Sequence, residues 1–483
     1  MPKRSATGAR STQSSAMRGK RRKPISDIHL PRVPSAQPLL HGLDSGPPLV
    51  VSPEPFIASV REPGWGAFLE PFMAQNQASF DALGLIPRIV SGREGVRLEL
   101  RPTLKAGAVP LKSAVTGKVA GGVVVGPRFG WSGIGKVLSA TGWGSGPEFL
   151  PFALVPGSGR EVPPWVVAGP VLYRLRELLL HLRRGYVERT EVRTSPRGQI
   201  QWSRYLAKQM PTGAWHQLPC RFTELSSDIR LRQVIKWTLE RVSQDIGMAA
   251  TDDAVGLVLL HELRHLLESL SDVYPVRPER HDFDAGASSR SLMSAYLQRG
   301  LQAIGWVVDE RGLGGGQNSD GLSWSLSLEQ LWESYVECLV KRDATLTGGS
   351  VRVGRLGETV IPLAWDDPFH RSLGHLVPDF VVYRGDSVEI IDAKYKSHFA
   401  DLDVNRWTEL AEETQAAMRA DIHQILAYAA AAGIGESVKA TLVYPVKQPV
   451  YEELAARACT ESKAFIPVGT RAITVAIRAA AFG

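Results

Sequence analysis

The chain contains 483 residues, of which 44% are hydrophobic and 22% are charged, and its formal net charge is +7. It is long enough for two or three domain cores, but no apolar run reaches membrane-spanning length and the N-terminal stretch lacks the hydrophobic segment of a secretory signal. These features argue against a membrane or secreted protein and predict a multidomain protein of the cytoplasm.

Most of the positive charge lies at the start of the chain. Residues 1–26 contain eight lysines and arginines and no acidic residue, which leaves the rest of the chain close to neutral. Cations mixed with Ser and small residues are typical of disorder, so we expect a disordered, basic and Pro-rich tail over residues 1–48. Such a tail either adds salt-sensitive affinity for DNA or RNA, or it is a solubilising leader, a wrongly assigned start or a transit peptide.

Deleting residues 1–26 tests the first of these roles of the tail. If its cations contact phosphates, the deletion should weaken nonspecific DNA binding and flatten the plot of log K against log salt by about 0.9 for each lost contact. Fluorescence anisotropy at several salt concentrations measures this slope. An unchanged slope would show that the tail is not a DNA-binding arm.

The middle of the chain divides into two predicted regions. Short Val- and Gly-rich runs separated by Gly and Pro predict a β-rich N-terminal domain over residues 49–165, a candidate partner-binding region. Apolar residues spaced three and four apart then predict packed helices, and hence a helical middle domain over residues 166–308. The Gly-rich segment 309–321 has the composition of a linker.

The last region, residues 322–483, is predicted to be an α/β domain. A helix is expected at residues 328–342, another near 412–432, and a strand at 439–446. The predicted fold class is therefore multidomain α+β, with a β-rich first domain, a helical middle and an α/β domain at the C-terminal end.

Two short motifs invite a functional interpretation. The segment Gly130–Val137 contains GxxxxGK, but Val137 stands where a P-loop has its Mg-binding Ser or Thr, and the sequence that follows is a poor helix former. We interpret it as a Gly-rich turn. The sequence HELRH places His261 and His265 one helical turn apart with Glu262 between them, as in a zinc protease, but no third ligand is evident and a leucine seam favours an ordinary packed helix.

The three cysteines are far apart and form no CxxC motif. This spacing argues against a disulfide framework or a thiolate metal site and predicts plain buried thiols. They are Cys220, Cys338 and Cys459.

The stretch from residue 377 to 396, VPDFVVYRGDSVEIIDAKYK, carries charges inside two apolar strands. If residues 384–387 form a four-residue hairpin loop, Asp379 lies opposite Asp392, where like charges repel. Strand alternation places Lys394 on the face of Asp392. A divalent cation with oxygen ligands would remove the repulsion, so this patch is a candidate Mg2+ site; its alternative is a surface hairpin with an ion pair.

This pattern resembles the PD-(D/E)xK nuclease superfamily. Pro378 and Asp379, followed after twelve residues by Asp392 and Lys394, match its motif. Three further residues agree with the resemblance: an acidic residue on the preceding helix and a QxxxY pair on the following one, namely Glu333, Gln424 and Tyr428.

Within that superfamily, residues 165–450 resemble McrC, the nuclease subunit of modified-cytosine restriction systems. The shared landmarks include Arg197 and Asp228, which the nuclease motif does not require, whereas Arg232 stands where the family has Asn. The resemblance implies a partner, the AAA+ GTPase McrB, and a DNA substrate that carries modified cytosine. Residues 1–165 match only loosely.

The combined interpretation is a Mg2+-dependent (or Mn2+-dependent) DNA endonuclease subunit of a restriction or anti-phage defence system. By the resemblance, Asp379, Asp392 and Glu333 hold metal, Lys394 orients or deprotonates the attacking water, and Gln424 and Tyr428 steady the site. The alternatives are a stand-alone repair or recombination nuclease, a zinc metalloprotease and a non-catalytic adaptor.

Overall fold

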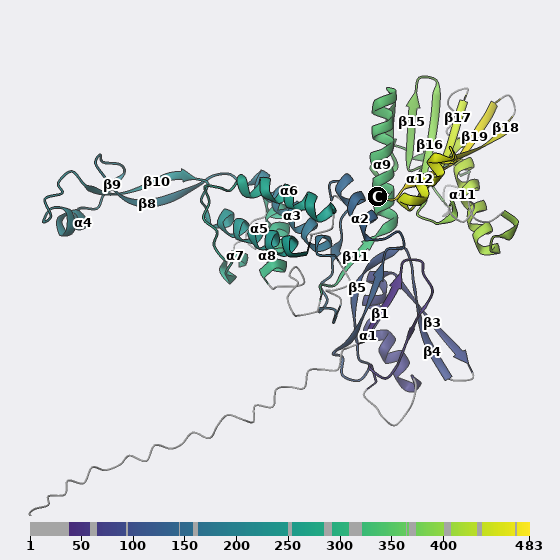
Figure 1. Ribbon diagram of the computed structural model, residues 1–483, viewed down its shortest axis with the longest axis horizontal. Helices are drawn as coiled ribbons and strands as arrows, with labels where there is room; N and C mark the ends of the chain where they lie inside the picture. The colour runs from purple at the N-terminus through teal and green to yellow at the C-terminus, as the bar shows by residue number, and fades with distance from the viewer. Residues whose placement is uncertain are drawn as a thin grey trace, which may run out of the picture. The chain divides into compact units, whose positions relative to one another are not determined.

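The computed structural model combines helices with several β-sheets (Figure 1), which confirms the mixed α/β, multidomain class. Among the residues it describes, no helix is both long and apolar enough to cross a membrane. The predicted tail lies outside the described residues up to position 37. The structure describes residues 38–483 except for 58–64, 93–94, 144, 158–162, 250–253, 285–291, 309–320, 364, 367–372, 400–406, 432–436 and 469–470.

The N-terminal part contains a five-stranded sheet in which two of the inner strands, β5 and β6, are buried on both faces. Strands β5 and β6 read as nearly continuous apolar runs for this reason. One face packs on helix α1 (Leu69–Leu83) and on a second sheet, and the other joins the core of the helical region. The strand order is β1 (Leu39–Leu43), β6 (Val119–Gly126), β5 (Lys105–Lys112), β11 (Trp324–Ser327) and β7 (Glu148–Phe149); the second sheet is β2 (Leu49–Val51), β4 (Gly95–Pro102) and β3 (Leu85–Gly92).

This sheet does not follow the predicted domain boundaries. Strand β1 lies inside the segment predicted to be a tail, and β11 lies beyond the predicted linker yet pairs with β5 and β7. Of the linker itself only Gly321 is described, and it forms an isolated bridge with Val155. The N-terminal sheet is therefore completed by residues from the last third of the chain.

The P-loop-like segment is a helix, so its interpretation as a Gly-rich turn is wrong. Helix α2 (Trp131–Ala140) buries Ile134 and Val137 in the core. Its glycines allow close packing, since a Cβ on Gly133 would lie 2.5 Å from the backbone oxygen of Phe482 and one on Gly135 would lie 2.5 Å from Val255. Helix contacts, and not phosphate binding, account for these glycines.

Replacing Gly135 with alanine should therefore destabilise the protein. The added methyl overlaps Val255 and lies 3.1 Å from Trp165, and overpacking of this kind costs about 1–3 kcal/mol. The matched control is Gly247→Ala on an exposed helix position with open space around it, which should raise stability by about 0.5–1 kcal/mol. Thermal melting of both variants measures the difference, and a neutral Gly135→Ala would contradict the tight helix contact.

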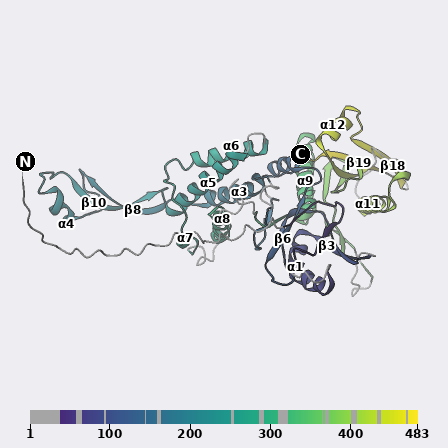
Figure 2. The same cartoon turned by 60° about the horizontal axis from the view of Figure 1, so that its bottom comes forward.

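The region predicted to be a helical domain contains packed helices and an additional three-stranded sheet, in the order β8, β10 and β9, which we call the ribbon. Figures 1 and 2 both show strands β8 and β10 paired along their length, with the short helix α4 near the tip. The ribbon was not predicted, because its residues alternate weakly. The elements are α3 (Trp165–His181), β8 (Gly185–Arg193), β9 (Gln199–Ile200), α4 (Trp202–Arg204), a π-helix (Tyr205–Gln209), β10 (Leu218–Ser226), α5 (Arg230–Ala249), α6 (Ala254–Glu268), α7 (Arg280–Asp284) and α8 (Leu292–Val308).

Side chains along the ribbon differ from those of the helices. The helices bury their apolar stripes in one core, whereas the ribbon leaves large apolar side chains open to solvent, among them Tyr186, Trp202 and Trp215. Landmark Arg197 lies over the ring of Phe222 and pairs with Glu224. Much of the apolar surface of the ribbon is therefore exposed, although Cys220 and Phe222 on β10 are buried.

The C-terminal part is a six-stranded mixed sheet with helices on both faces, as Figure 1 shows for α9 and α11. The predicted helices and the strand at 439–446 are confirmed, with α9 extending five residues further. Strands β16 and β17 run parallel and are joined through α11, a βαβ arrangement. The main elements are α9 (Leu328–Thr347), β12 (Ser350–Val353), β15 (Phe380–Arg384), β16 (Ser387–Ala393), α11 (Glu412–Ala431), β17 (Ser437–Val446), α12 (Gln448–Ala456), β18 (Glu461–Val468) and β19 (Arg471–Ala481).

Candidate functional site

The hairpin that carries the charged stretch has the predicted register but a tighter loop. Phe380 pairs with Ile391 and Arg384 pairs with Ser387, so the loop holds two residues and not four. Gly385 has a φ of 58°, which suits the first position of such a loop. Continuing this register by one residue sets Asp379 opposite Asp392.

The two aspartates lie at the edge of a buried strand pair. Asp392 is 2% exposed, and Asp379 accepts a 2.8 Å hydrogen bond from the backbone N–H of Ala393. Burial, reinforced by the charge of Asp392, raises the pKa of Asp379 to about 7, and burial also raises the pKa of Asp392. Without a bound cation, ionisation of this pair is therefore energetically unfavourable.

Lys394 joins Asp392 to helix α11. Its Nζ lies 2.7 Å from Oδ2 of Asp392 and donates a 2.9 Å hydrogen bond to Oε1 of Gln424. Gln424 in turn donates to the hydroxyl of Tyr428 at 2.7 Å. Burial alone would lower the pKa of Lys394, but the charge of Asp392 outweighs burial and raises it, so Lys394 is an ammonium. The structure thus connects four of the predicted residues in one chain of contacts.

A second group beside this chain was missed from the sequence. Asp421, 4% exposed on α11, accepts two hydrogen bonds from Lys396 at 2.7 and 2.9 Å and one from the hydroxyl of Tyr444 at 3.0 Å. The charge of Asp421 contributes to the raised pKa values of Asp392 and Lys394. The signal was present: residues 421, 424 and 428 share one face of a helix, at spacings of three and four.

Glu333 lies on α9, which packs on the other face of the sheet. Burial raises the pKa of its carboxyl, and the charges of Glu337, Glu329 and Asp392 add to this effect against the opposing charge of Arg355. Among the described residues, no three His, Cys, Asp or Glu side chains are arranged to hold one metal ion together. The charge of Glu333 in turn contributes to the raised pKa of Asp379, so Glu333 acts on the aspartate pair through its charge.

The HELRH motif forms part of an ordinary amphipathic helix. His261 and His265 are exposed on α6, with their Nε2 atoms 3.1 Å apart, while Leu263 and Leu270 are buried. No third ligand joins them among the described residues. The packed-helix interpretation is thereby confirmed for the leucine seam.

The cysteines differ in burial from the prediction of plain buried thiols. All three are free, but Cys220 alone is buried; Cys338 is partly exposed and Cys459 is exposed.

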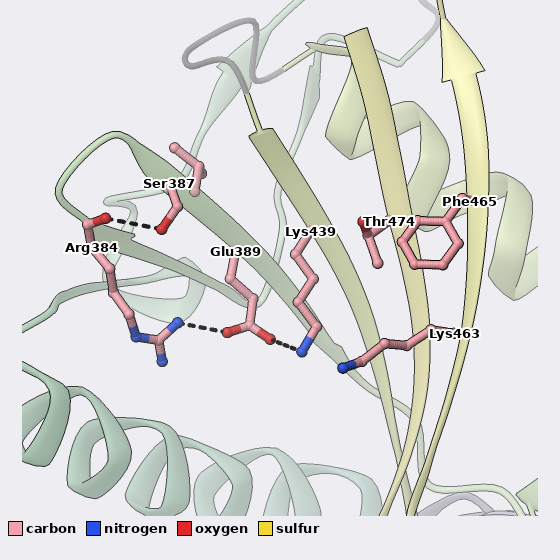
Figure 3. A pocket seen from close by; sticks show the side chains of 8 residues that line it. Arg384, Ser387, Glu389, Lys439, Lys463, Phe465 and Thr474 are labelled. Atoms are coloured by element: carbon pink, nitrogen blue, oxygen red, sulfur yellow. Dashed lines mark hydrogen bonds and ion pairs between the residues drawn. The ribbon is translucent and has the colours of Figure 1, made fainter.

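A pocket at the loop end of the same hairpin is built around a satisfied carboxylate (Figure 3). Glu389 accepts hydrogen bonds from Arg384 at 2.7 Å and Thr441 at 2.8 Å, and lies 3.2 Å from Lys439. It points to the face opposite Asp392, as strand alternation predicts. Because every acidic oxygen here has a cationic or hydroxyl partner, this pocket is a structural ion-pair network.

The landmarks before α5 also have defined contacts. Asp228 accepts hydrogen bonds from Gln233 at 2.9 Å and from the backbone N–H of Tyr274 at 3.2 Å. Arg232 donates to the backbone oxygen of Leu182 at 3.0 Å. Both residues therefore fix the junction between the ribbon and the helices.

Comparison with known proteins identifies one family, and distantly similar solved structures are found as well. Residues 171–445, more than half of the chain, match the family described as McrBC 5-methylcytosine restriction system component. A half-complex from a tetradecameric assembly of Thermococcus gammatolerans McrB AAA+ hexamers with bound McrC matches at 11% identity and a TM-score of 0.38, over 92% of this chain and 94% of that chain. A cryo-EM structure of the Thermococcus gammatolerans McrBC complex matches at 12% identity and a TM-score of 0.27, over 63% and 88%. The search of curated proteins found no match.

Proposed function

The chain belongs to the family of McrBC 5-methylcytosine restriction system components, and from this premise we propose that it is the Mg2+-dependent DNA endonuclease subunit of such a system. The observation that carries the proposal is the convergence of Asp379, Asp392 and Lys394 at one sheet edge. Two carboxylates and an ammonium at the end of a hairpin are the groups that hydrolysis of a phosphodiester needs.

The donor set fits a hard divalent cation. Asp379 and Asp392 offer carboxylate oxygens in a place where burial and mutual repulsion make an added positive charge favourable. When bound, Mg2+ or Mn2+ would lower the pKa of a water molecule and polarise the scissile phosphate. Glu333 lies on α9 at the other face of the sheet, and we assign it only to the water shell of this metal ion.

The residues around the metal position have distinct roles in this proposal. Lys394 is charged, so it orients the attacking water and offsets negative charge that develops on the phosphate, and does not act as a base while it remains protonated. Gln424 holds the Lys394 ammonium through its side-chain oxygen, and Tyr428 fixes the amide of Gln424. Lys396 lies two residues after Lys394, on the same face, and its hydrogen bond to Asp421 ties this part of the segment to α11.

The nucleotide-driven step is assigned to a separate subunit. The P-loop-like segment forms helix α2, whose apolar face is buried, and offers no phosphate-binding loop. We therefore assign GTP hydrolysis to an McrB-like AAA+ partner, in line with the family. A chain that is close to neutral outside its tail also needs a partner to hold DNA.

The test is cleavage of plasmid DNA, methylated or unmethylated at cytosine, with and without Mg2+, GTP and an McrB-like subunit. We expect cleavage of the methylated plasmid only when all components are present. Cleavage without GTP and partner would favour a stand-alone nuclease, and intact DNA under every condition would favour an adaptor. A protease activity lost in Glu262→Gln but retained in Asp392→Asn would overturn the proposal in favour of a metalloprotease.

A further inference from the structure

A buried ion pair of the N-terminal sheet reaches the segment that carries Lys394. Strands β1 and β6 are parallel, so they end at the same edge, where Asp44 follows β1 and Arg128 follows β6. The backbone N–H of Arg128 donates a 2.6 Å hydrogen bond to Oδ1 of Asp44, and its Nε lies 3.1 Å from Oδ2. Asp44 is fully buried, which fixes the direction of the guanidinium.

The other end of this guanidinium contacts the residue next to Lys394. Nη2 of Arg128 donates a 2.9 Å hydrogen bond to the backbone oxygen of Tyr395, and the guanidinium carbon lies 4.6 Å from the centre of the Tyr395 ring. Tyr395 is 2% exposed and packs edge-on against Phe129 and beside Phe482. Arg128 thus uses separate nitrogens for the N-terminal sheet and for the nuclease segment.

The sheet holds the backbone only at the start of this segment. The backbone N–H of Lys394, the first residue after β16, donates to the oxygen of Val443 on β17 at 2.9 Å. Arg128 supplies the next contact, to the backbone oxygen of Tyr395. Stability alone does not account for this arrangement, because a buried ion pair contributes little net stability relative to apolar residues of similar size.

We propose that Arg128, oriented by Asp44, is a positioning residue. It holds the backbone carbonyl of Tyr395, the residue after Lys394, and so makes DNA hydrolysis depend on the N-terminal sheet. The inference rests on the proposed nuclease function and deepens it, since it names what controls the site. A displacement of Lys394 by about 1 Å is enough to cost about 100-fold in rate, so the contact has leverage on catalysis without touching substrate.

The first measurement is single-turnover cleavage by the complete complex containing wild-type, Arg128→Ala or Arg128→Lys protein. Arg128→Ala should lower the cleavage rate constant about 10- to 100-fold, with DNA affinity and Mg2+-induced thermal stabilisation within twofold of wild type. Arg128→Lys should not restore the rate, because an ammonium cannot reach Asp44 and Tyr395 with separate nitrogens. The matched control is Arg230→Ala, which breaks another pair with a buried aspartate, Asp282, far from the site in sequence and should cut at the wild-type rate.

A mutant cycle tests whether Asp44 acts through Arg128. Asp44→Asn should slow cleavage, and the double variant Asp44→Asn with Arg128→Ala should be no slower than Arg128→Ala alone. Additive losses would show that the two residues act independently and would overturn this part of the assignment. If Arg128→Ala does not fold, the cleavage rates of Arg128→Lys, Asp44→Asn and their double variant are compared in the same way.

Hydrogen exchange of the free protein provides a readout that does not depend on cleavage. In Arg128→Ala the amides of residues 394–396 should exchange about tenfold faster, whereas those of β17 and α11 should not change. If wild-type protein cuts no DNA, the proposed function fails, but this local acceleration would still support the positioning contact. Unchanged exchange at residues 394–396, or faster exchange throughout the sheet, would overturn the positioning role of Arg128. Cleavage by Arg128→Ala at the wild-type rate would overturn it as well.

Discussion

Replacing Lys394 with alanine should reduce DNA cleavage by about 10²- to 10⁴-fold while leaving the partner's GTP hydrolysis unchanged. The reason is that the Lys394 ammonium meets Asp392 and Gln424 at the proposed reaction centre but is not an oxygen ligand of a metal. Metal binding and DNA binding should therefore survive the substitution. Arginine should be a poor replacement, because its planar head does not fit a site built for a compact ammonium.

The assay measures cleavage of methylated plasmid and GTP hydrolysis in the same reactions. The control variant is Lys447→Ala, which removes an exposed lysine from the same domain and should cut at the wild-type rate. Equal cutting by Lys394→Ala and wild type would show that Lys394 has no part in the chemistry. Loss of cutting together with loss of GTPase stimulation would instead indicate a folding defect, which thermal melting would reveal.

A second large effect concerns stability in the absence of divalent cations. Asp379 has an ordinary pKa of 3.8 when unfolded and about 7 when folded, so the folded state binds its proton more tightly. Its contribution to stability is full below about pH 4 and is lost as the pH rises to about 7, by at most about 4 kcal/mol. Added Mg2+ or Mn2+ should restore stability at neutral pH, by about 2.7 kcal/mol at a hundredfold excess over Kd.

The comparison that isolates this effect is wild type against Asp379→Asn. Other carboxylates titrate in both proteins, so the difference in melting temperature between them reports on Asp379. Asn should stabilise the metal-free protein at pH 7, have little effect at pH 4, and abolish most of the stabilisation by metal. If the melting temperatures of both proteins change neither with pH nor with millimolar metal, the paired-carboxylate site is ruled out.

The candidate site could be predicted from the sequence to the extent that it depends on local periodicity. The opposition of Asp379 and Asp392 follows from a short loop and the two-residue period of strands, and Gln424 and Tyr428 follow from helical spacing. Asp421 has the same spacing, but a single aspartate on a helix is usually solvent-exposed, and nothing local indicates that Lys396 and Tyr444 surround it.

The parts that could not be predicted depend on residues far apart in the chain. Arg128 reaches Tyr395 across 267 positions, and β11 pairs with β5 across more than two hundred. Neither contact has a local signature, because pairing partners and buried ion pairs are chosen by the tertiary fold. The helix α2 was missed for a related reason: its glycines are poor helix formers, and close packing against Val255 and Phe482 overrides this propensity.

The placement of β11 between β5 and β7 sets the order in which the protein can fold as it leaves the ribosome. Until residue 327 has emerged, β5 has a bare hydrogen-bonding edge and β7 has no neighbour. An exposed edge of this kind recruits other strands, so an N-terminal fragment that ends before residue 324 should aggregate when expressed alone. Supplying residues 322–483 as a second polypeptide during synthesis should rescue its solubility, since it brings the missing strand.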